Sequence, residues 1–194
     1  MLKIGGFTPF ATIDYPGHLA AVLFCQGCPW RCGYCHNPEL LAETASSKFS
    51  WDEVLAFLER RRGLLDAVVF SGGEPTMQPG LLQAIGTVKS MGFLAGLHTG
   101  GAFPEKLAEL LPHLDWVGMD IKAPFPDYAI ITGVSGSGEL AKHSSYLVRE
   151  SGIAHEFRTT LHPYLLEAGR LEILKRLISE GWGSTFRVQA IWGI

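Results

Sequence analysis

Three cysteines stand close together in the chain, at a spacing that suits an iron–sulfur cluster. Cys28, Cys32 and Cys35 are separated by three residues and then by two. Thiolates are soft ligands, and compact cysteine runs of this kind hold Fe–S clusters. Three thiolates bind three irons of a [4Fe-4S] cluster and leave the fourth iron without a protein ligand. The spacing therefore predicts a metal cluster with one open coordination position, where a small molecule can bind and react.

The fourth cysteine, Cys25, leaves two alternatives open. A zinc knuckle would use all four thiolates, but it usually has a long spacer where only three residues separate Cys28 from Cys32. A closed electron-transfer cluster would also use all four. Cys25 ends the apolar run 19–24 and is typical of a buried strand residue, so we leave it out of the cluster. A disulfide framework is not expected from cysteines gathered in one short segment.

The composition is that of a globular protein with one core. The chain has 194 residues, 47% of them hydrophobic, and a formal net charge of -3. We expect a single domain over residues 1–194. The charges form no basic block and no apolar run is long enough to span a bilayer, so we expect neither nucleic-acid nor membrane binding. The first residues lack the apolar stretch of a signal peptide, which predicts a cytoplasmic protein with reduced thiols.

Apolar strand-like runs alternate with helical patterns, which predicts βα units around a parallel sheet. After a short lead we expect strands at 19–25, 67–71, 94–99, 116–121, 155–160 and 185–191. Helical patterns fall at 51–62, 79–91, 104–111, 138–151 and 167–180. Ser50 and Glu53 form a capping-box pattern at the start of the first helix. Six repeats are too few for a closed eight-stranded barrel, so we expect an α/β fold, a partial (β/α)6 TIM-like barrel with outer helices and functional loops at the carboxyl ends of its strands.

Charged residues recur at alternate positions of the later strands, and alternate positions face the same side of a sheet. The sets that share a face are Asp120 with Lys122, then Glu156, Arg158 and Thr160, then Arg187 with Gln189. Closed barrels fill their interior with branched apolar residues. Because unpaired buried charges are costly, we interpret this face as the wall of a ligand cavity. Internal ion pairs without a ligand are the alternative.

A buried strand at 68–71 leads directly into Gly72, Gly73 and Glu74. Glycine adopts positive φ and lets the backbone come close to a ligand. A strand that ends in two glycines is also an ordinary turn. Likewise Asp120 and Lys122 would be an ordinary ion pair in isolation, and His36-Asn37-Pro38 would be a capping turn.

Taken together, these motifs resemble the radical S-adenosylmethionine (SAM) superfamily. The cysteine spacing is its signature, including an aromatic residue, Tyr34, before the last cysteine. Over nearly the whole chain the sequence is similar to the activating proteins of anaerobic ribonucleoside-triphosphate reductase, and pyruvate formate-lyase activases share most of the same elements. The motifs that carry this resemblance are Gly5-Gly6-Phe7, Ile13-Asp14-Tyr15-Pro16-Gly17, Gln26-Gly27-Cys28, Cys35-His36-Asn37, Gly72-Gly73-Glu74-Pro75, Asp120-Ile121-Lys122 and Phe157-Arg158-Thr159-Thr160.

The resemblance implies roles for particular side chains. Cys28, Cys32 and Cys35 would bind the [4Fe-4S] cluster and act in catalysis. The residues expected to bind SAM are Tyr34, Gly72, Gly73, Glu74, Thr99, Asp120, Lys122, Arg158 and His162, with the Gly-Gly-Glu element on the amino group and the Asp-x-Lys element near the ribose. His98-Thr99-Gly100-Gly101 departs from the Asp-Thr-Asn-Gly that related activases show. The roles of His98 and Cys25 are left open.

The resemblance also implies an activity. The open iron would chelate the amino and carboxylate groups of SAM, and an electron from the reduced cluster would cleave the S–C5′ bond. The resulting 5′-deoxyadenosyl radical would take a hydrogen atom from a backbone glycine of a partner, a glycyl-radical enzyme, here anaerobic ribonucleotide reductase. A flavodoxin or ferredoxin would supply the electron. The alternatives are a pyruvate formate-lyase-type activase, a radical SAM enzyme acting on a small molecule, and a non-catalytic iron–sulfur protein.

The ligand assignment gives a direct prediction. Anaerobic reconstitution should yield one [4Fe-4S] cluster per chain, because only Cys28, Cys32 and Cys35 have the compact spacing. Iron, sulfide and visible absorption are measured for each Cys→Ala variant. Loss of the cluster in Cys25→Ala, with retention in a variant of the trio, would show that the assignment is wrong.

Overall fold

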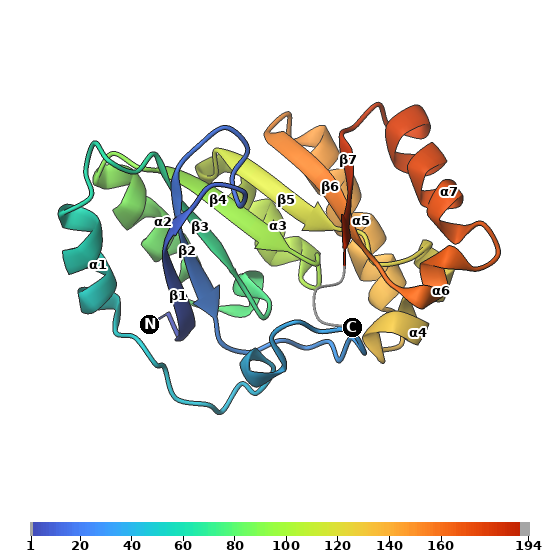
Figure 1. Cartoon of the computed structure of the whole chain (residues 1–194), viewed down its shortest axis with the longest axis horizontal. Coiled ribbons are helices and arrows are strands. Elements are labelled where there is room, and N and C mark those ends of the chain that lie inside the picture. The colour runs from blue at the N-terminus through green and yellow to red at the C-terminus, as the bar shows by residue number, and fades with distance from the viewer. Residues whose placement is uncertain (1, 191–194) are drawn as a thin grey trace.

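The computed structural model describes residues 2–190, which form a curved seven-stranded sheet flanked by helices (Figure 1). The strands follow one another across the sheet in chain order. β1 pairs with β2 in the antiparallel sense, and all later neighbours are parallel. The strands are β1 (Ile4–Ala11), β2 (Ala20–Cys25), β3 (Ala67–Gly72), β4 (Leu94–Thr99), β5 (Trp116–Asp120), β6 (Ala154–Leu161) and β7 (Phe186–Ala190).

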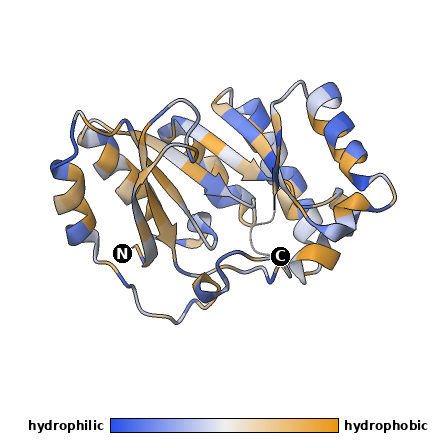
Figure 2. Cartoon of the chain, in the orientation of Figure 1, coloured by the Kyte–Doolittle hydropathy of each residue, from blue (hydrophilic) through white to orange (hydrophobic). Residues whose placement is uncertain are grey.

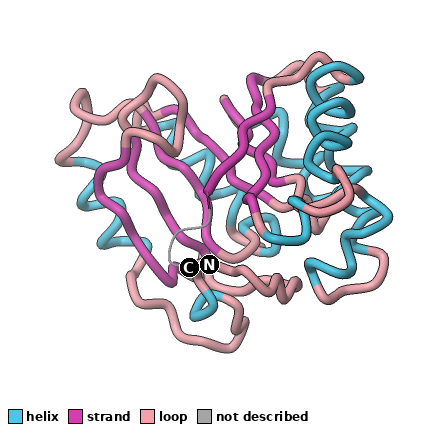
Figure 3. Tube along the Cα trace, turned by 45° about the vertical axis from the view of Figure 1, so that its right-hand side comes forward, coloured by secondary structure: helices cyan, strands magenta, loops and turns pink. Residues whose placement is uncertain are grey.

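Helices connect the parallel strands and lie on the outer side of the curved sheet (Figure 3). They are α1 (Trp51–Glu59), α2 (Leu81–Ser90), α3 (Pro104–Leu110), α4 (Tyr128–Thr132), α5 (Ser137–Glu150), α6 (Pro163–Leu166) and α7 (Arg170–Lys175), which continues into a π-helical turn, Arg176–Gly181. None of the helices in residues 2–190 has the length and apolar character needed to span a bilayer.

The predicted partial barrel is confirmed, with one strand more than expected. All six predicted strands are present within one or two residues of their expected ends, except that residue 191 lies outside the described residues. The added strand is β1, in the segment that was expected to be only a short lead. Its glycines, Gly5 and Gly6, are poor strand residues by propensity, and the pairing with β2 is what makes this segment a strand.

The five predicted helices are also present, although the last is shorter and ends in the π-helical turn. The capping box at α1 is confirmed, because the Ser50 hydroxyl accepts from the Glu53 amide while the Glu53 carboxylate accepts from the Ser50 amide. The short helices α4 and α6 were not predicted. Arg170, at the start of α7, lies 3.7 Å from the carboxylate of Asp127, just before α4, and its Nη1 donates to the Tyr164 carbonyl in α6 at 3.1 Å. Tertiary contacts therefore support these single turns.

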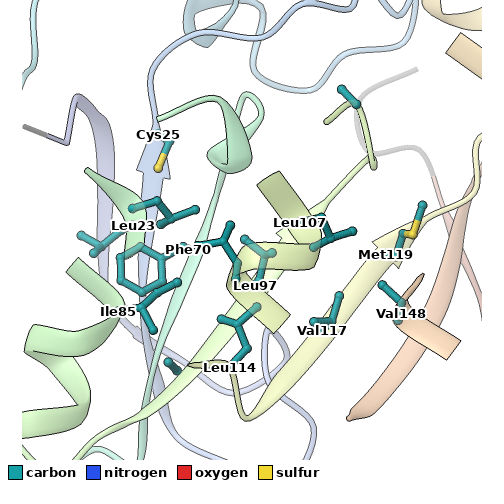
Figure 4. Packing of buried hydrophobic residues seen from close by; sticks show 14 of the residues in the cluster. Leu23, Cys25, Phe70, Ile85, Leu97, Leu107, Leu114, Val117, Met119 and Val148 are labelled. Carbon is teal, nitrogen blue, oxygen red and sulfur yellow. The ribbon is translucent and has the colours of Figure 1, made fainter. Parts of the chain in front are cut away.

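The outer face of the sheet carries the main hydrophobic core. Leu23, Phe70 and Leu97 are register partners on β2, β3 and β4, and they pack against Ile85 of α2 (Figure 4). All four side chains are fully buried. Residues of β2 and β3 are apolar along most of their length, as expected for strands covered on both faces (Figure 2).

The inner face of the sheet is apolar at the amino ends of the parallel strands, here called the floor of the barrel. There a second buried cluster gathers Ala20, Val22, Ala67, Val69 and Trp116. Tyr15, from the loop between β1 and β2, inserts among them and stacks on Trp116 with ring centroids 5.2 Å apart. Gly96 leaves the space, since a Cβ there would lie 3.1 Å from the Tyr15 ring. The loop at residues 12–19 thus closes the floor of the barrel.

This floor gives a stability prediction. Tyr15→Ala should lower the free energy of unfolding by about 3 kcal/mol, because it removes a large buried ring and leaves a cavity. Ile13→Ala in the same loop is the control, since Ile13 is 77% exposed and should change stability by less than about 0.5 kcal/mol. Urea denaturation measures both. Equal, small effects would mean that the loop does not close the floor.

Candidate functional site

A cavity of about 180 Å³ opens at the carboxyl ends of the strands, at the opposite end of the barrel from the apolar floor. Every residue predicted for the site lines this cavity except His162. The blue segment that follows β2 and carries the cysteines runs along this edge of the sheet (Figure 1). The structure therefore brings the cysteine loop, the Gly-Gly-Glu turn and the charged ends of β5 and β6 together around one space.

The cysteine loop presents three half-buried thiols to the cavity. The loop is fixed to α4 by a hydrogen bond of 2.8 Å from the Arg31 amide to the Thr132 carbonyl. Burial raises the pKa of the Cys28 thiol to about 11 and also raises that of Cys32. A bound metal reverses this preference, because coordination stabilises the thiolate directly.

Within residues 2–190, no three His, Cys, Asp or Glu side chains lie close enough together to hold a single metal ion. A [4Fe-4S] cluster makes a different demand, since each thiolate binds its own iron. Cys25 is separated from the trio: it is fully buried in the main core and is not among the residues that line the cavity (Figure 4).

Gly72 and Gly73 let the Gly-Gly-Glu turn pass close to the base of the cysteine loop. Gly72 has φ +108°, and a Cβ there would collide with the backbone of Cys25. A Cβ on Gly73 would collide with the carbonyl of Gly27. The Gly73 amide donates to Cys25 O at 2.9 Å, and the Glu74 amide donates to Gly27 O at 2.8 Å. These glycines are therefore required for packing one loop on another.

Glu74 is a buried junction between two strand ends. Its carboxylate accepts hydrogen bonds from the amide and hydroxyl of Thr76, the hydroxyl of Thr99 and the amide of Gly100. The side chain is only 2% exposed. Glu74 thus fixes the ends of β3 and β4 beside each other, and Thr99 contributes to the site through this contact.

Asp120 lies at the centre of a charged cluster on the cavity wall. Its Oδ1 is 3.1 Å from Nη2 of Arg158, and its Oδ2 is 3.5 Å from Nζ of Lys122. Burial alone would raise the pKa of Asp120, but the two cations hold it below its usual value. Burial opposes the charge on Lys122, yet acidic neighbours, Tyr34 first among them, keep its pKa well above normal. Two cations face one anion, so this wall suits a ligand carboxylate.

Strand parity predicted the cavity wall in part: Glu156, Arg187 and Gln189 do not line the cavity, and the alternative of internal ion pairs is partly realised. Asp120, Lys122, Arg158 and Thr160 all line the cavity. Glu156, one layer below, instead pairs with Arg187 at 3.2 Å. The inner charges are therefore paired within the protein and still border an open space.

His162 lies behind the cavity wall. Its ring stacks on Tyr34 with centroids 4.7 Å apart, and its Nε2 is 3.2 Å from the Lys122 carbonyl. The ring is buried, and burial lowers its pKa. It is placed to support Tyr34, whose hydroxyl is buried without a hydrogen-bond partner among the described residues.

His98, whose role the sequence leaves open, also lines the cavity. Its Nδ1 is 3.2 Å from the Ser71 hydroxyl, and its Nε2 lies 2.8 Å from the Asp14 carbonyl and 3.0 Å from Nη1 of Arg158. Burial, with the charge of Arg158, lowers the pKa of His98 to about 3. The ring is therefore neutral at physiological pH.

Other lining residues were not predicted for the site. Trp30 lies inside the cysteine motif, and Ser71 shares an inward face with Val69, so strand parity could have found it. Trp30 also shows why Gly100 is a glycine, since a Cβ there would lie 2.6 Å from its ring. The remaining unpredicted lining residues are His36, Asn37, Leu41 and Gly100.

The residues present fit a [4Fe-4S] cluster and an amino-acid ligand. Three thiols from one loop face the cavity, and Lys122 and Arg158 on its wall are cations that suit a carboxylate. Tyr34, whose hydroxyl has no hydrogen-bond partner among the described residues, also lines the cavity. Such a donor set, soft sulfur on one side and cations on the other, matches a cluster with an open position.

Comparison with known proteins agrees with this geometry. A family model described as the Radical SAM superfamily matches residues 22–177. The chain is 29% identical over 184 residues to a protein of Methanocaldococcus jannaschii named provisionally as a glycyl-radical enzyme activating enzyme, which covers 91% of this chain and 75% of that protein. It is 34% identical over 144 residues to the pyruvate formate-lyase-activating enzyme of Clostridium pasteurianum, which covers 71% of this chain and 60% of that enzyme.

Solved structures show the same fold at low identity. The structure titled native anSMEcpe with bound AdoMet has a TM-score of 0.65 and 14% identity, and the match covers 86% of this chain and 49% of that one. QueE from Escherichia coli has a TM-score of 0.55 and 16% identity, and the match covers 97% of this chain and 93% of that one.

The neutral His98 predicts a specific acid sensitivity. Between pH 6.5 and about 3 the unfolded chain binds a proton at His98 that the folded chain does not, so stability falls as the pH drops through this window. From pH 7 to pH 5 the metal-free protein should lose about 2 kcal/mol from this residue. The groups that face the ring are Ser71, the Asp14 carbonyl, Arg158 and Trp116.

Urea denaturation of His98→Gln at the two pH values tests this. The variant should lose about 2 kcal/mol less than the parent over the same interval. His113→Gln, at an exposed position, is the matched control and should behave as the parent. An unchanged loss in His98→Gln would contradict the assignment.

Proposed function

The chain belongs to the radical SAM superfamily, and we propose that it is an activating enzyme that generates a glycyl radical on a partner protein. The superfamily's cofactors are a [4Fe-4S] cluster and SAM. The observation that carries the proposal is the single cavity that joins the cysteine trio, the Gly-Gly-Glu turn and the Asp120 cluster. The names of the relatives in Methanocaldococcus jannaschii and Clostridium pasteurianum support the activase class.

In this proposal Cys28, Cys32 and Cys35 hold the cluster. When bound, the reduced cluster and SAM together supply the radical that removes a hydrogen atom from the target. Lys122 favours the charged form of the Cys32 thiol, since its positive charge lowers the pKa that burial raises. The same cation and Arg158 provide the positive wall for the SAM carboxylate.

The other side chains position these groups. Glu74 holds the β3 and β4 ends together, so that the SAM amino group meets a fixed turn. His162 fixes Tyr34 by stacking. His98 is neutral, and its hydrogen bond with the Asp14 carbonyl fixes the loop that forms the floor. The buried floor around Tyr15 and Trp116 excludes water from the amino ends of the strands.

The partner that we favour is anaerobic ribonucleotide reductase, because the Gly-Gly-Phe and Ile-Asp-Tyr-Pro-Gly elements are similar to those of its activating proteins. A second candidate is pyruvate formate-lyase, which the name of the Clostridium relative favours. In either case a one-electron donor such as flavodoxin or ferredoxin reduces the cluster. We also propose that the chain forms one radical SAM domain over residues 1–194 and acts in the cytoplasm, where cysteine thiols stay reduced.

Electron paramagnetic resonance tests the proposal. The reconstituted, reduced protein is mixed anaerobically with SAM and a candidate glycyl-radical enzyme, unlabelled or deuterated at the glycine α-carbon. We expect a doublet that collapses on labelling, with deuterium in 5′-deoxyadenosine. Glycine suits this reaction because a segment without a side chain enters a narrow cavity.

Variants of the cysteines provide the control. Cys32→Ala should give no radical, whereas Cys25→Ala, a core change outside the cavity, should retain it. Turnover of a small metabolite with no radical on any candidate partner would replace the activase proposal with a small-molecule reaction.

A further inference from the structure

The cysteine loop leaves and re-enters the body of the protein at two adjoining segments. Residues 28–37 contain neither helix nor strand. At the base of the loop, the amides of Gly27 and Cys28 donate to the carbonyls of Leu40 and Leu41, at 2.7 and 3.3 Å. These backbone hydrogen bonds hold the two ends of the loop beside each other.

A buried glutamine strengthens this closure. Nε2 of Gln26 donates to the carbonyls of Glu39 and Ala42, at 3.0 and 2.8 Å. Both partners are acceptors, so the amide nitrogen must face them, and both of its N–H groups are used. The side chain is 2% exposed, so water cannot replace these bonds if the amide is lost.

A second buried glutamine binds the backbone of the first through its side-chain amide. Nε2 of Gln78 donates to the Gln26 carbonyl at 2.6 Å, and its Oε1 accepts from the Lys3 amide at 3.0 Å. Gln78 directly follows the 3-10 turn Pro75–Met77, next to Glu74. The two glutamines therefore join the N-terminal segment, the end of β2, the turn after β3 and the far end of the cysteine loop.

The glycine at position 5 belongs to the same arrangement. A Cβ on Gly5 would collide with Oε1 of Gln26 and with the Leu40 side chain. The Gly-Gly-Phe lead and the Gln-Gly-Cys element, which have no chemistry of their own, thus meet at one buried point.

We infer that Gln26 and Gln78, here called the amide clasp, are positioning residues that close the cysteine loop before metal binds. Neither lines the cavity, so both act through the loop. Because the clasp already holds the ends of the loop together, cluster binding does not carry the entropy cost of closing the loop. Ligands that are preorganised in this way retain metal better. The inference rests on the cluster of the superfamily and is independent of the proposed partner.

Replacing each glutamine with methionine tests the clasp, since methionine keeps the length and removes the amide. Release of iron from the reconstituted cluster to a chelator is followed well below the melting temperature. Gln26→Met and Gln78→Met should release iron about tenfold faster than the parent, the effect expected for lost buried hydrogen bonds. Equal rates in the parent and in both variants would overturn the inference.

Two controls separate positioning from general loss of stability. Gln83→Met, on an exposed site of α2, controls for the residue type. Asp115→Ala removes hydrogen bonds to Ala95 and Lys89 at the other end of the sheet, and controls for destabilisation. Both should stay within about twofold of the parent rate. If Asp115→Ala lowers the melting temperature as much as the glutamine variants do and releases iron as fast as they do, stability alone governs retention and the inference is wrong.

Hydrogen exchange on the unchanged, metal-free chain decides the matter even if a variant fails to fold. The Gly27 and Cys28 amides should be protected, because their bonds to residues 40 and 41 are already formed. In Gln26→Met they should exchange at least about tenfold faster, while strand amides of β3 stay unchanged. Exchange at the free-peptide rate in the parent would show that the loop is open without metal, and the inference would be wrong.

Discussion

The buried carboxylate of Glu74 is the contact on which the rest of the site depends. Its acceptor oxygens collect donors from Thr76, Thr99 and Gly100, and each would be left unsatisfied and buried without it. The neighbouring amides of Gly73 and Glu74 bond to the segment before the cysteines. The loops that follow β2, β3 and β4 are thereby fixed to one another, and the cavity is the space that they border.

A barrel with so few strands must fill its interior differently at its two ends. At the amino ends of the strands a loop fills the interior, since Tyr15 supplies the apolar volume that missing strands would otherwise provide. At the carboxyl ends of the strands the interior keeps charged side chains, whose burial is tolerable because Asp120 pairs with both Lys122 and Arg158. Glycines at inward positions, such as Gly96 and Gly118, give these large side chains their room.

Much of this arrangement was predictable because it follows from strong local patterns. The βα alternation gave the fold, and strand parity placed Asp120 and Arg158 on the inner wall. The cysteine loop and the Gly-Gly-Glu turn meet because both follow carboxyl ends of neighbouring parallel strands.

The parts that sequence reasoning missed depend on contacts between distant segments. β1 is a strand because β2 pairs with it. Its glycines are there for packing, since Gly5 leaves room for the Gln26 side chain and Gly6 lies against Phe24. His162 supports a residue of the cysteine loop, a role that no spacing could indicate. Glu74 reads as a ligand-binding acid in sequence, yet in the structure its carboxylate is occupied by the protein's own donors.

One ring nitrogen of His98 faces two partners of opposite hydrogen-bonding character. Nε2 is within bonding distance of both an acceptor, the Asp14 carbonyl, and a donor, Nη1 of Arg158. A neutral imidazole nitrogen either carries a proton or accepts one, so it can satisfy only one of these partners at a time. The tautomer with the proton on Nε2 binds the floor loop, and the tautomer with the proton on Nδ1 binds the arginine. The floor of the cavity therefore has two hydrogen-bonding states that differ in the position of one proton and require no movement of the chain.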